Sequence, residues 1–309
     1  MIILINCMHG LGNKLFDLLI GFFIQKLNGG EIYFVYNKGF NNKRIEPNID
    51  DIFPNLRKDV KFIKEREMRE LKEKYKESLF IANNRNISVL DDLKFNNRYK
   101  LVYFFNNFYL YKYIYDIFKI LSKKIIENFE FNFNLISKKV LDISKTKYAS
   151  IHIRYGDKLD ISSKKEYKFN FLVYHPRFYI KMIKTFIKNN INVYIVTDDE
   201  NIVQKFILNK VKQSDKVEIL KIPSIEALYL LSHSKYLVLS MSTFSMFAAL
   251  INKNLRKAFI ASRPEEINKF KQGEEDLIEK INWKIYSKKK YILNYDVKLI
   301  NEMIKFRIN

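Results

Sequence analysis

A repeated order of short apolar runs and amphipathic segments constrains the fold of this 309-residue chain more than any other feature. Each run has the length of a buried strand and ends in small or polar residues, after which a helix-like pattern begins. The order recurs at residues 1–6, 148–153, 193–196 and 236–239. Because strands that alternate with helices form parallel sheets, the sequence predicts an α/β protein. Its length suffices for two domains.

Residues 148–158, YASIHIRYGDK, form the most informative strand end. Alternation with a period of two places Ile151 and Ile153 on one face and His152 and Arg154 on the other. Ligands of open α/β sheets bind at the carboxyl ends of strands, and an arginine there is shaped to hold a phosphate with two parallel hydrogen bonds. The glycine that follows, at position 156, permits a tight turn or the close approach of a ligand. The alternative is an ordinary strand end with a surface arginine.

The first strand is followed by a glycine-containing turn and an amphipathic helix, CMHGLGNKLFDLLIGFF. Gly10 and Gly12 flank Leu11, and Asn13 has the side chain of a helix cap. The spacing lacks the third glycine of the dinucleotide-binding fingerprint. The glycines indicate either that backbone approaches a ligand closely here or that a tight turn packs against the strand.

Two further strand ends carry polar groups. The strand at 193–196 is followed by Thr197, Asp198 and Asp199, whose carboxylates suit ribose or base recognition, or capping of the next helix. The strand at 236–239 is followed by SMSTFSMFAALIN, which crowds hydroxyl groups at the start of a helix. A helix N-terminus of this kind is a ready anion site.

The remaining segments are expected to support these strand ends. Residues 64–77 predict a solvated, ion-paired helix, and the aromatic run at 108–118 predicts a core helix. We also expect a short helix at 135–143, a polar loop over the site at 159–174, and charged, helical, peripheral structure after residue 261.

The composition excludes several classes of protein. One cysteine rules out a disulfide framework, and four histidines without ligand spacing predict no metal site. No signal peptide or membrane span is evident, so we expect a cytoplasmic protein. The net charge of +21 accompanies abundant Lys, Asn, Ile, Tyr and Phe, which indicates compositional bias and not a nucleic-acid site. Peripheral contact with an anionic membrane is the more plausible use of this charge, at about 1 kcal/mol per nearby Lys or Arg.

Four stretches together, HGLGNKLFDLL, IHIRYGDK, VYIVTDDE and LVLSMSTFSMFAALIN, carry a family resemblance. Their order and spacing resemble those of the α-1,2-fucosyltransferases of glycosyltransferase family eleven, and of their α-1,6 and protein O-fucosyltransferase relatives. The resemblance covers about residues 1–252. It implies a GT-B-like fold, in which two Rossmann-like domains face a cleft, with an acceptor-side domain at 1–145 and a nucleotide-sugar-binding domain at 146–309. It also implies GDP-fucose as the donor, a glycan acceptor and no metal cofactor.

The resemblance also assigns roles to individual residues. Arg154 matches the arginine that binds the β-phosphate, His152 a residue beside the guanine, and Asp198 a carboxylate that accepts from the guanine. Residues of the phosphate-binding turn match Ser242, Thr243, Phe244 and Ser245, and those of the N-terminal loop near the fucose and acceptor match Gly10, Gly12 and Asn13. Asp157 and His9 are the candidate general bases, and for each the alternative is a structural residue of a turn or loop.

The chain departs from the family pattern at several positions. Tyr155 stands where relatives carry a second arginine, and Lys158 stands where the α-1,2 enzymes have tyrosine. These changes leave open the linkage and the acceptor. The expected function is an inverting fucosyl transfer. The alternatives are a related transferase that uses another GDP-sugar or forms another linkage, and a protein that binds sugar nucleotides or glycans without catalysis.

Overall fold

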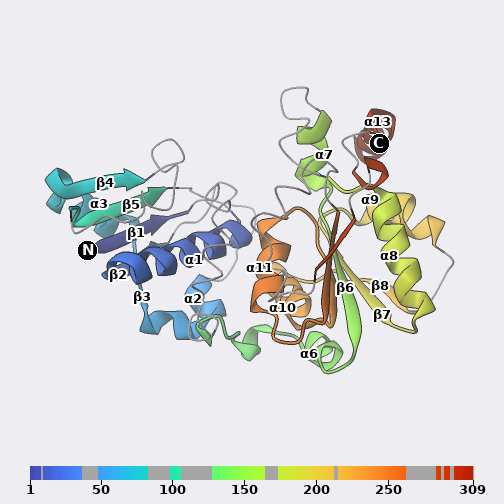
Figure 1. Cartoon of the computed structure of the whole chain (residues 1–309), viewed down its shortest axis with the longest axis horizontal. Helices are drawn as coiled ribbons and strands as arrows, with labels where there is room; N and C mark the ends of the chain where they lie inside the picture. The colour runs from blue at the N-terminus through green and yellow to red at the C-terminus, as the bar shows by residue number, and fades with distance from the viewer. Residues whose placement is uncertain are drawn as a thin grey trace. The chain divides into compact units, whose positions relative to one another are not determined.

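The computed structural model describes residues 1–7, 10–36, 48–82, 98–105, 127–163, 173–211, 215–261, 283–286, 289–292 and 296–308. The chain divides into two compact units, Met1–Leu135 and Ile136–Asn309. Figure 1 labels the elements of both units. Each unit contains its own parallel sheet, so the predicted α/β class is confirmed.

The first unit has a five-stranded parallel sheet in the order β3-β2-β1-β5-β4. Its strands are β1 (Ile2–Asn6), β2 (Glu31–Val35), β3 (Val60–Ile63), β4 (Leu79–Ala82) and β5 (Leu101–Phe105). Its helices are α1 (Leu11–Asn28), α2 (Ile49–Ile52) and α3 (Glu65–Lys74), with short 3₁₀ turns at η1 (Pro54–Lys58) and η2 (Lys76–Ser78). The central strand β1 is buried because it pairs with β2 on one side and β5 on the other.

Helix α1 follows β1 as expected, but its cap differs from the prediction. Gly10 is the N-cap residue, whereas Asn13 lies inside the first turn. The helix buries an almost continuous apolar surface that includes Leu15, Phe16 and Leu19. One acidic residue, Asp17, is buried with it at 3% exposure.

Helix α3 confirms the prediction of a solvated helix at residues 64–77. Two ion pairs at i,i+4 spacing, Arg66 with Glu70 and Arg69 with Glu65, lie on its exposed surface. Met68 is its buried residue. The predicted aromatic helix at 108–118 lies outside the described residues.

The second unit has a six-stranded parallel sheet in the order β11-β10-β9-β6-β7-β8. Its strands are β6 (Tyr148–Ile153), β7 (Asn192–Thr197), β8 (Val217–Ile219), β9 (Tyr236–Val238), β10 (Lys257–Ala261) and β11 (Trp283–Tyr286). Counted along the chain this is the 3-2-1-4-5-6 order of the Rossmann fold, with β6 as strand one. The order reverses between β6 and β9, where such sheets bind ligands.

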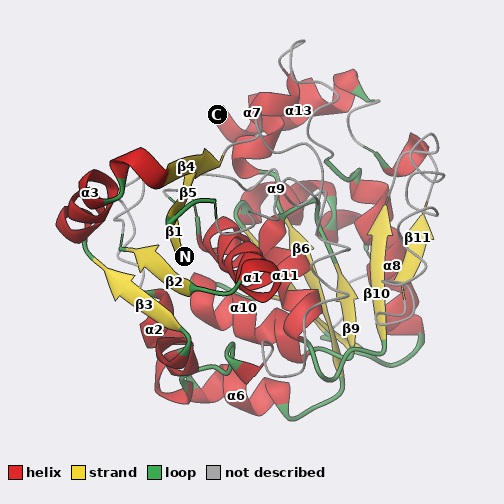
Figure 2. Cartoon of the chain, turned by 60° about the vertical axis from the view of Figure 1, so that its left-hand side comes forward, coloured by secondary structure: helices red, strands yellow, loops and turns green. Residues whose placement is uncertain are grey.

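Helices cover both faces of this second sheet. The helices of the second unit are α6 (Lys138–Ser144), α7 (Gly156–Ser163), α8 (Pro176–Lys188), α9 (Glu200–Phe206), α10 (Ser224–His233), α11 (Thr243–Ile251) and α13 (Val297–Ile308), with 3₁₀ turns at η7 (Leu208–Lys210) and η9 (Lys289–Tyr291). The 3₁₀ turn η5 (Phe133–Leu135) ends the first unit. Figures 1 and 2 show α8 on one side of the sheet and α10 and α11 on the other. Helices α7 and α13 lie side by side.

The structure corrects several local predictions. Residues 156–163 are helix α7, so the first part of the loop predicted at 159–174 is helical; residues 164–172 lie outside the described residues. The segment around Trp283, predicted to be helical, is strand β11 at the edge of the sheet. A short apolar run of this kind does not distinguish a strand from a helix by periodicity alone.

The end of the chain is not peripheral, contrary to the prediction. Ile300 and Met303 of α13 are buried in the core of the second unit at 1% and 0% exposure, together with Tyr291 and Ile292. Helix α6, which the predicted boundary at 145/146 assigns to the first domain, packs against α10 of the second unit, where the Ser137 hydroxyl donates to Glu226 at 2.7 Å.

Candidate functional site

The carboxyl end of β6 lies at the centre of the second sheet, between β7 and β9. All six residues of β6 are buried. Since three parallel strands end at this edge, the side chains that follow β6, β7 and β9 come close together. The sequence predicts Arg154, Asp198 and the turn at Ser242–Ser245 (the Ser242 turn) at these three ends. Side-chain contacts connect the three ends.

His152 joins the end of β6 to the turn after β9. Its Nδ1 atom lies 2.7 Å from the Ser240 hydroxyl, and its ring centroid lies 5.4 Å from that of Phe244. Burial lowers the pKa of His152 to about 3, and the positive charge of Arg154 adds to the shift. The imidazole is therefore neutral near pH 7, and it serves as a fixed hydrogen-bonding group on the sheet edge.

The turn between β9 and α11 is built by its own hydroxyl groups. Ser242 is the N-cap of α11 and accepts a hydrogen bond from the Phe244 N–H at 3.3 Å. The fully buried Ser245 donates to the carbonyl oxygens of Ser240 and Ser242. These two serines shape the turn, while Thr243 and Phe244 are half-buried. The positive end of the α11 dipole points out of this turn, which favours an anion there.

Arg154 lies between two carboxylates. Its Nε and Nη2 atoms donate to the two oxygens of Asp157 at 3.2 and 3.3 Å, and Nε lies 4.0 Å from Asp198 Oδ2. The Arg154 side chain is 37% exposed and that of Asp157 is 52% exposed. The guanidinium is thus accessible to a ligand, and Asp157 occupies its Nε/Nη2 edge.

Asp198 does not cap helix α9, which was the structural alternative for this residue. The cap is Asp199, whose carboxylate accepts from the Ile202 N–H at 3.1 Å. Asp198 Oδ1 instead accepts from the backbone N–H groups of Tyr155 and Gly156 at 2.9 and 3.2 Å. Burial raises the pKa of the Asp198 carboxyl, and these two hydrogen bonds oppose that shift. Asp198 therefore holds the turn that carries Arg154.

Tyr155, which replaces the family's second arginine, points away from the site. It is fully buried, its hydroxyl donates to the Tyr174 carbonyl at 3.0 Å, and its ring packs edge-on against Tyr179. The residue belongs to the core, so it contributes no group to a phosphate clamp. The neighbouring Lys158 is a further cation near Asp157, at 4.0 Å, and burial lowers its pKa.

The predicted residues of the N-terminal loop lie in the first unit. Gly10 is exposed at the start of α1, Gly12 is buried, and Asn13 is half-buried in the first helical turn. His9 lies outside the described residues. The structure therefore brings the second-unit residues together at one sheet edge. Gly10, Gly12 and Asn13 belong to the first unit.

Two contacts at the site were missed by the sequence analysis. The sequence places Ser240 only in a turn crowded with hydroxyl groups, whereas in the structure it is the hydrogen-bonding partner of His152. Arg307, at the end of the chain, donates a hydrogen bond to the Gly156 carbonyl. The position of Ser240 directly after a strand was a usable signal, whereas nothing in the local sequence marks Arg307.

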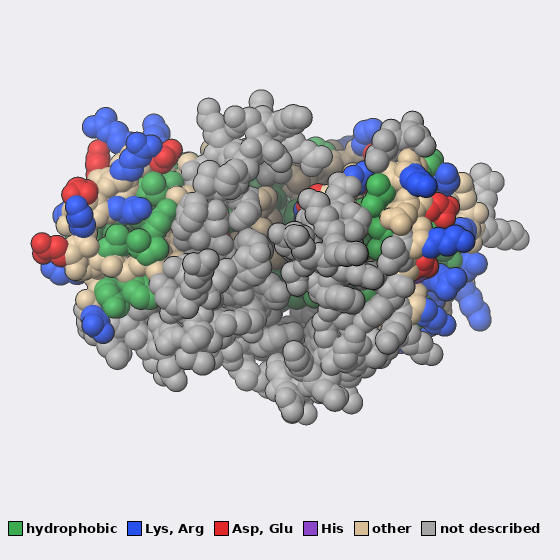
Figure 3. Space-filling view, turned by 90° about the horizontal axis from the view of Figure 1, so that it is seen from above, with side chains coloured by type: hydrophobic (Ala, Val, Ile, Leu, Met, Phe, Trp, Pro, Cys, Tyr) green, Lys and Arg blue, Asp and Glu red, His purple; other side chains and the backbone are tan. Residues whose placement is uncertain are grey.

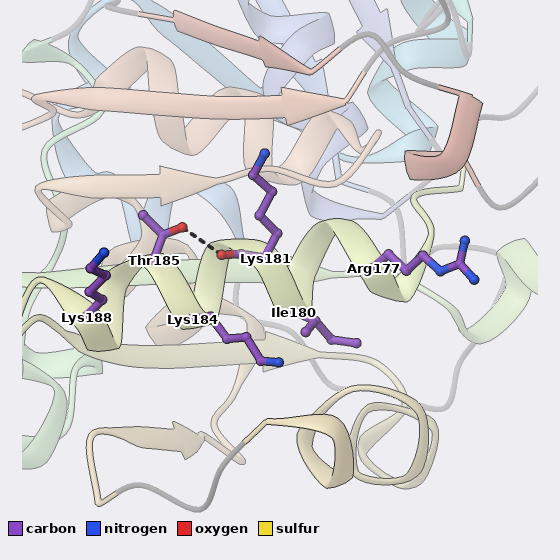
Figure 4. A pocket seen from close by; sticks show the side chains of 6 residues that line it. All are labelled: Arg177, Ile180, Lys181, Lys184, Thr185 and Lys188. Carbon is purple, nitrogen blue, oxygen red and sulfur yellow. Dashed lines mark hydrogen bonds between the residues drawn. The ribbon is translucent and has the colours of Figure 1, made fainter.

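A separate hollow of about 450 Å³ runs along the solvent side of α8. Figure 4 shows its lining residues along this helix, namely Arg177, Ile180, Lys181, Lys184, Thr185 and Lys188. None of the predicted site residues lines it. Figure 3 shows the molecule from above, where the basic side chains of the described residues are interspersed with acidic ones, in agreement with a compositional bias.

The described residues contain neither a membrane-spanning helix nor a cluster of metal ligands. No described helix is long and apolar enough to cross a membrane. Among the same residues, no group of three or more His, Cys, Asp or Glu side chains is arranged to hold a metal ion.

No curated protein matches this chain. Among solved structures, it is similar to the NodZ α-1,6-fucosyltransferase soaked with GDP-fucose (12% identity, 81% of this chain and 92% of that one, TM-score 0.45) and to POFUT1 in complex with GDP-fucose (10%, 84% and 96%, 0.47). The heptosyltransferase WaaC of E. coli with ADP is also similar (10%, 100% and 98%, 0.43).

The family model described as "Glycosyl transferase family 11" matches residues 5–287, which confirms the resemblance found in the four motifs. The match includes the ends of β6, β7 and β9, and it ends before helix α13. Since it spans most of the sequence, the chain belongs to glycosyl transferase family 11 and is a glycosyltransferase.

Proposed function

We propose that this enzyme transfers L-fucose from GDP-fucose to a hydroxyl group of a glycan acceptor, with inversion at the anomeric carbon and formation of an α-1,2 linkage. The family and its four motifs support the proposed donor and linkage. The product belongs to the synthesis of a surface polysaccharide or glycoconjugate.

In the proposed reaction, the acceptor oxygen forms a bond to the anomeric carbon of β-linked fucose as the bond from that carbon to the β-phosphate oxygen breaks. The electron pair of the breaking bond leaves with GDP, so negative charge develops on the diphosphate. Arg154 and the N-terminus of α11 are the groups that would stabilise this charge. The proton of the acceptor hydroxyl passes to a base, for which Asp157 and His9 are the candidates.

The observation that carries the proposal is the position of Arg154. It follows β6 at the point where the strand order reverses, and the hydrogen bond between His152 and Ser240 ties β6 to the turn before α11. A partly exposed guanidinium and a helix N-terminus at this edge suit a nucleoside diphosphate. His152, Asp198, Thr243 and Phe244 are the proposed contacts for the rest of the donor.

Nucleotide-dependent stabilisation tests the donor class. A ligand that binds only the folded state at 100 times its Kd raises stability by about 2.7 kcal/mol. We expect GDP to raise the Tm of the purified protein and UDP at the same concentration to leave it nearly unchanged. Equal shifts with GDP and UDP, or none with GDP, would contradict a guanine-specific site. A comparison of the Tm shifts produced by GDP-mannose and GDP-fucose then tests which sugar the site prefers.

Catalysis is separated from simple binding by measuring GDP release from GDP-fucose in the absence of acceptor. A transferase hydrolyses its donor slowly, because water replaces the acceptor, whereas a binding protein leaves GDP-fucose intact. Protein that is stabilised by GDP-fucose but releases no GDP, with or without glycan acceptors, supports the non-catalytic alternative. The anomeric configuration and linkage of the product, determined by NMR, test inversion and the α-1,2 assignment.

A second property, contact with an anionic membrane, is favoured by the hollow along α8. Four basic residues, Arg177, Lys181, Lys184 and Lys188, line it without an acidic residue among the lining side chains. Each cation near an anionic surface contributes about 1 kcal/mol. Co-sedimentation with phosphatidylglycerol vesicles that weakens in Lys184→Glu/Lys188→Glu and in high salt would support this contact. Equal sedimentation with phosphatidylcholine vesicles would argue against it.

A further inference from the structure

Helix α13 (Val297–Ile308) begins beyond residue 287, where the family match ends, yet it is firmly attached to the second unit. Ile300 and Met303 are buried in the core. The ring of Phe306 packs edge-on against Phe206 of α9, with centroids 5.8 Å apart. The helix is therefore an integral part of the second unit.

The N-terminus of α13 is joined to the N-terminus of α8. Asp296 Oδ1 accepts from the Leu299 N–H at 3.1 Å, and Asp296 Oδ2 lies 3.4 Å from Nε2 of the buried His175. His175 in turn caps α8, since its Nδ1 accepts from the Arg177 N–H at 3.0 Å. This connection fixes where α13 starts, and the helix then runs alongside α7.

The far end of α13 reaches the turn that carries the candidate phosphate-binding arginine. The Arg307 guanidinium donates a hydrogen bond to the carbonyl oxygen of Gly156, whose N–H donates to Asp198. Both polar groups of Gly156 are thus held by side chains from distant parts of the chain. Arg154 and Asp157 lie two residues before Gly156 and one residue after it, so the position of Gly156 sets the position of both.

We infer that Arg307 is a positioning residue for donor binding: it holds the carbonyl group of Gly156 while Asp198 holds the N–H group, and it thereby keeps Arg154 where it meets the diphosphate. The inference rests on the proposed function for its ligand, but the positioning itself concerns only this chain. It assigns a role at the active site to a helix that the family match does not include.

The test compares Arg307→Ala and Arg307→Lys with Lys305→Ala, a control at an exposed position on the same helix. The first readout is hydrogen exchange of the peptide containing residues 154–158. We expect Arg307→Ala to accelerate exchange of the Tyr155 and Gly156 amides, Arg307→Lys to do so less because it keeps a cationic donor, and Lys305→Ala to leave it unchanged. Unchanged exchange in Arg307→Ala would overturn the inference, whether or not the protein binds GDP.

The second readout is the Kd for GDP together with the separate KM values for donor and acceptor. Loss of a hydrogen bond from a charged donor predicts about a tenfold increase in the Kd for GDP and in the donor KM, with the acceptor KM unchanged and partial recovery in Arg307→Lys. A purely structural role would lower the Tm but leave the Kd of the folded protein unchanged, and that result would overturn the inference. Absence of GDP binding by the wild-type protein would instead refute the proposed function, while the exchange measurement still decides the positioning role.

Discussion

The carboxylate of Asp198 occupies the space that a side chain at Gly156 would need. A Cβ atom built on Gly156 would lie 2.6 Å from Asp198 Oδ2 and 3.0 Å from its Cγ. The same carboxylate accepts the Tyr155 and Gly156 N–H groups, so it cannot move away without losing both hydrogen bonds. The glycine of the IHIRYGDK stretch is therefore required for the approach of a side chain and not, in this structure, for the approach of a ligand.

Gly156→Ala tests this relationship. The added methyl group should displace Asp198 and leave the two N–H groups without their acceptor, at a cost of roughly 1–3 kcal/mol in the free energy of unfolding. Chemical denaturation measures the change. Gly10→Ala serves as the control for stability alone, because no heavy atom lies within 4 Å of a Cβ built there. A Gly156→Ala protein as stable as the wild type would show that Asp198 is not fixed as described.

Arg154→Ala should abolish most of the transferase activity. By comparison with the removal of one preorganised electrostatic group, we expect a fall of roughly 10²-fold or more in kcat/KM for the donor. The control is Arg66→Ala, which removes an exposed arginine of α3 whose side chain is 90% exposed. Near-normal turnover by a folded Arg154→Ala protein would refute the role proposed for this residue.

Asp157→Asn separates two roles for this carboxylate. Both of its oxygens accept from Arg154, so we expect it to orient the arginine, and its replacement by asparagine should lower kcat by less than about tenfold. Loss of a general base would lower kcat by roughly 10² to 10⁴-fold and change the pH profile. Asp142→Asn is a matched control, because Asp142 also pairs at i,i+3 spacing, with Lys145, and is similarly exposed at 53%.

Asp17 should make stability depend on pH. Burial raises the pKa of its carboxyl from 3.8 to about 7, partly offset by a hydrogen bond with Cys7. The unfolded chain loses this proton near pH 4 and the folded protein near pH 7, so stability falls as pH rises between these values and is level above them. The shift corresponds to roughly 4 kcal/mol.

The neutral variant Asp17→Asn should remove most of that slope and be the more stable protein at pH 7. Urea denaturation at pH 4.5, 6 and 7.5 measures the free energy of unfolding of each protein. Asp215→Asn, at an exposed position, is the control. If wild type and Asp17→Asn show the same dependence on pH, Asp17 is not the buried acid responsible.

Several features of the site were predictable because they depend on the end of a strand. Arg154 and the Ser242 turn each follow a buried apolar run, His152 lies in the last part of one, and the ends of parallel strands meet at one edge of a sheet. The Ser242 cap could be predicted from the residue type and its position before a helix. Asn13 shows the limit of that argument. The N-cap is Gly10, about one turn earlier, because a residue type that favours capping does not fix the boundary of a helix.

The sequence by itself determined the alternation of strands and helices, the parallel sheets and the polar strand ends, because these follow from periodicities within a few residues. Tertiary structure alone decided which groups those side chains contact. The partner of Asp198 lies 43 residues away at Tyr155, and Arg307 reaches Gly156 across 151 residues. It also decided that Tyr155 faces the core while Arg154 faces the site edge. Contacts of this kind depend on how the whole chain packs, and no local pattern encodes them.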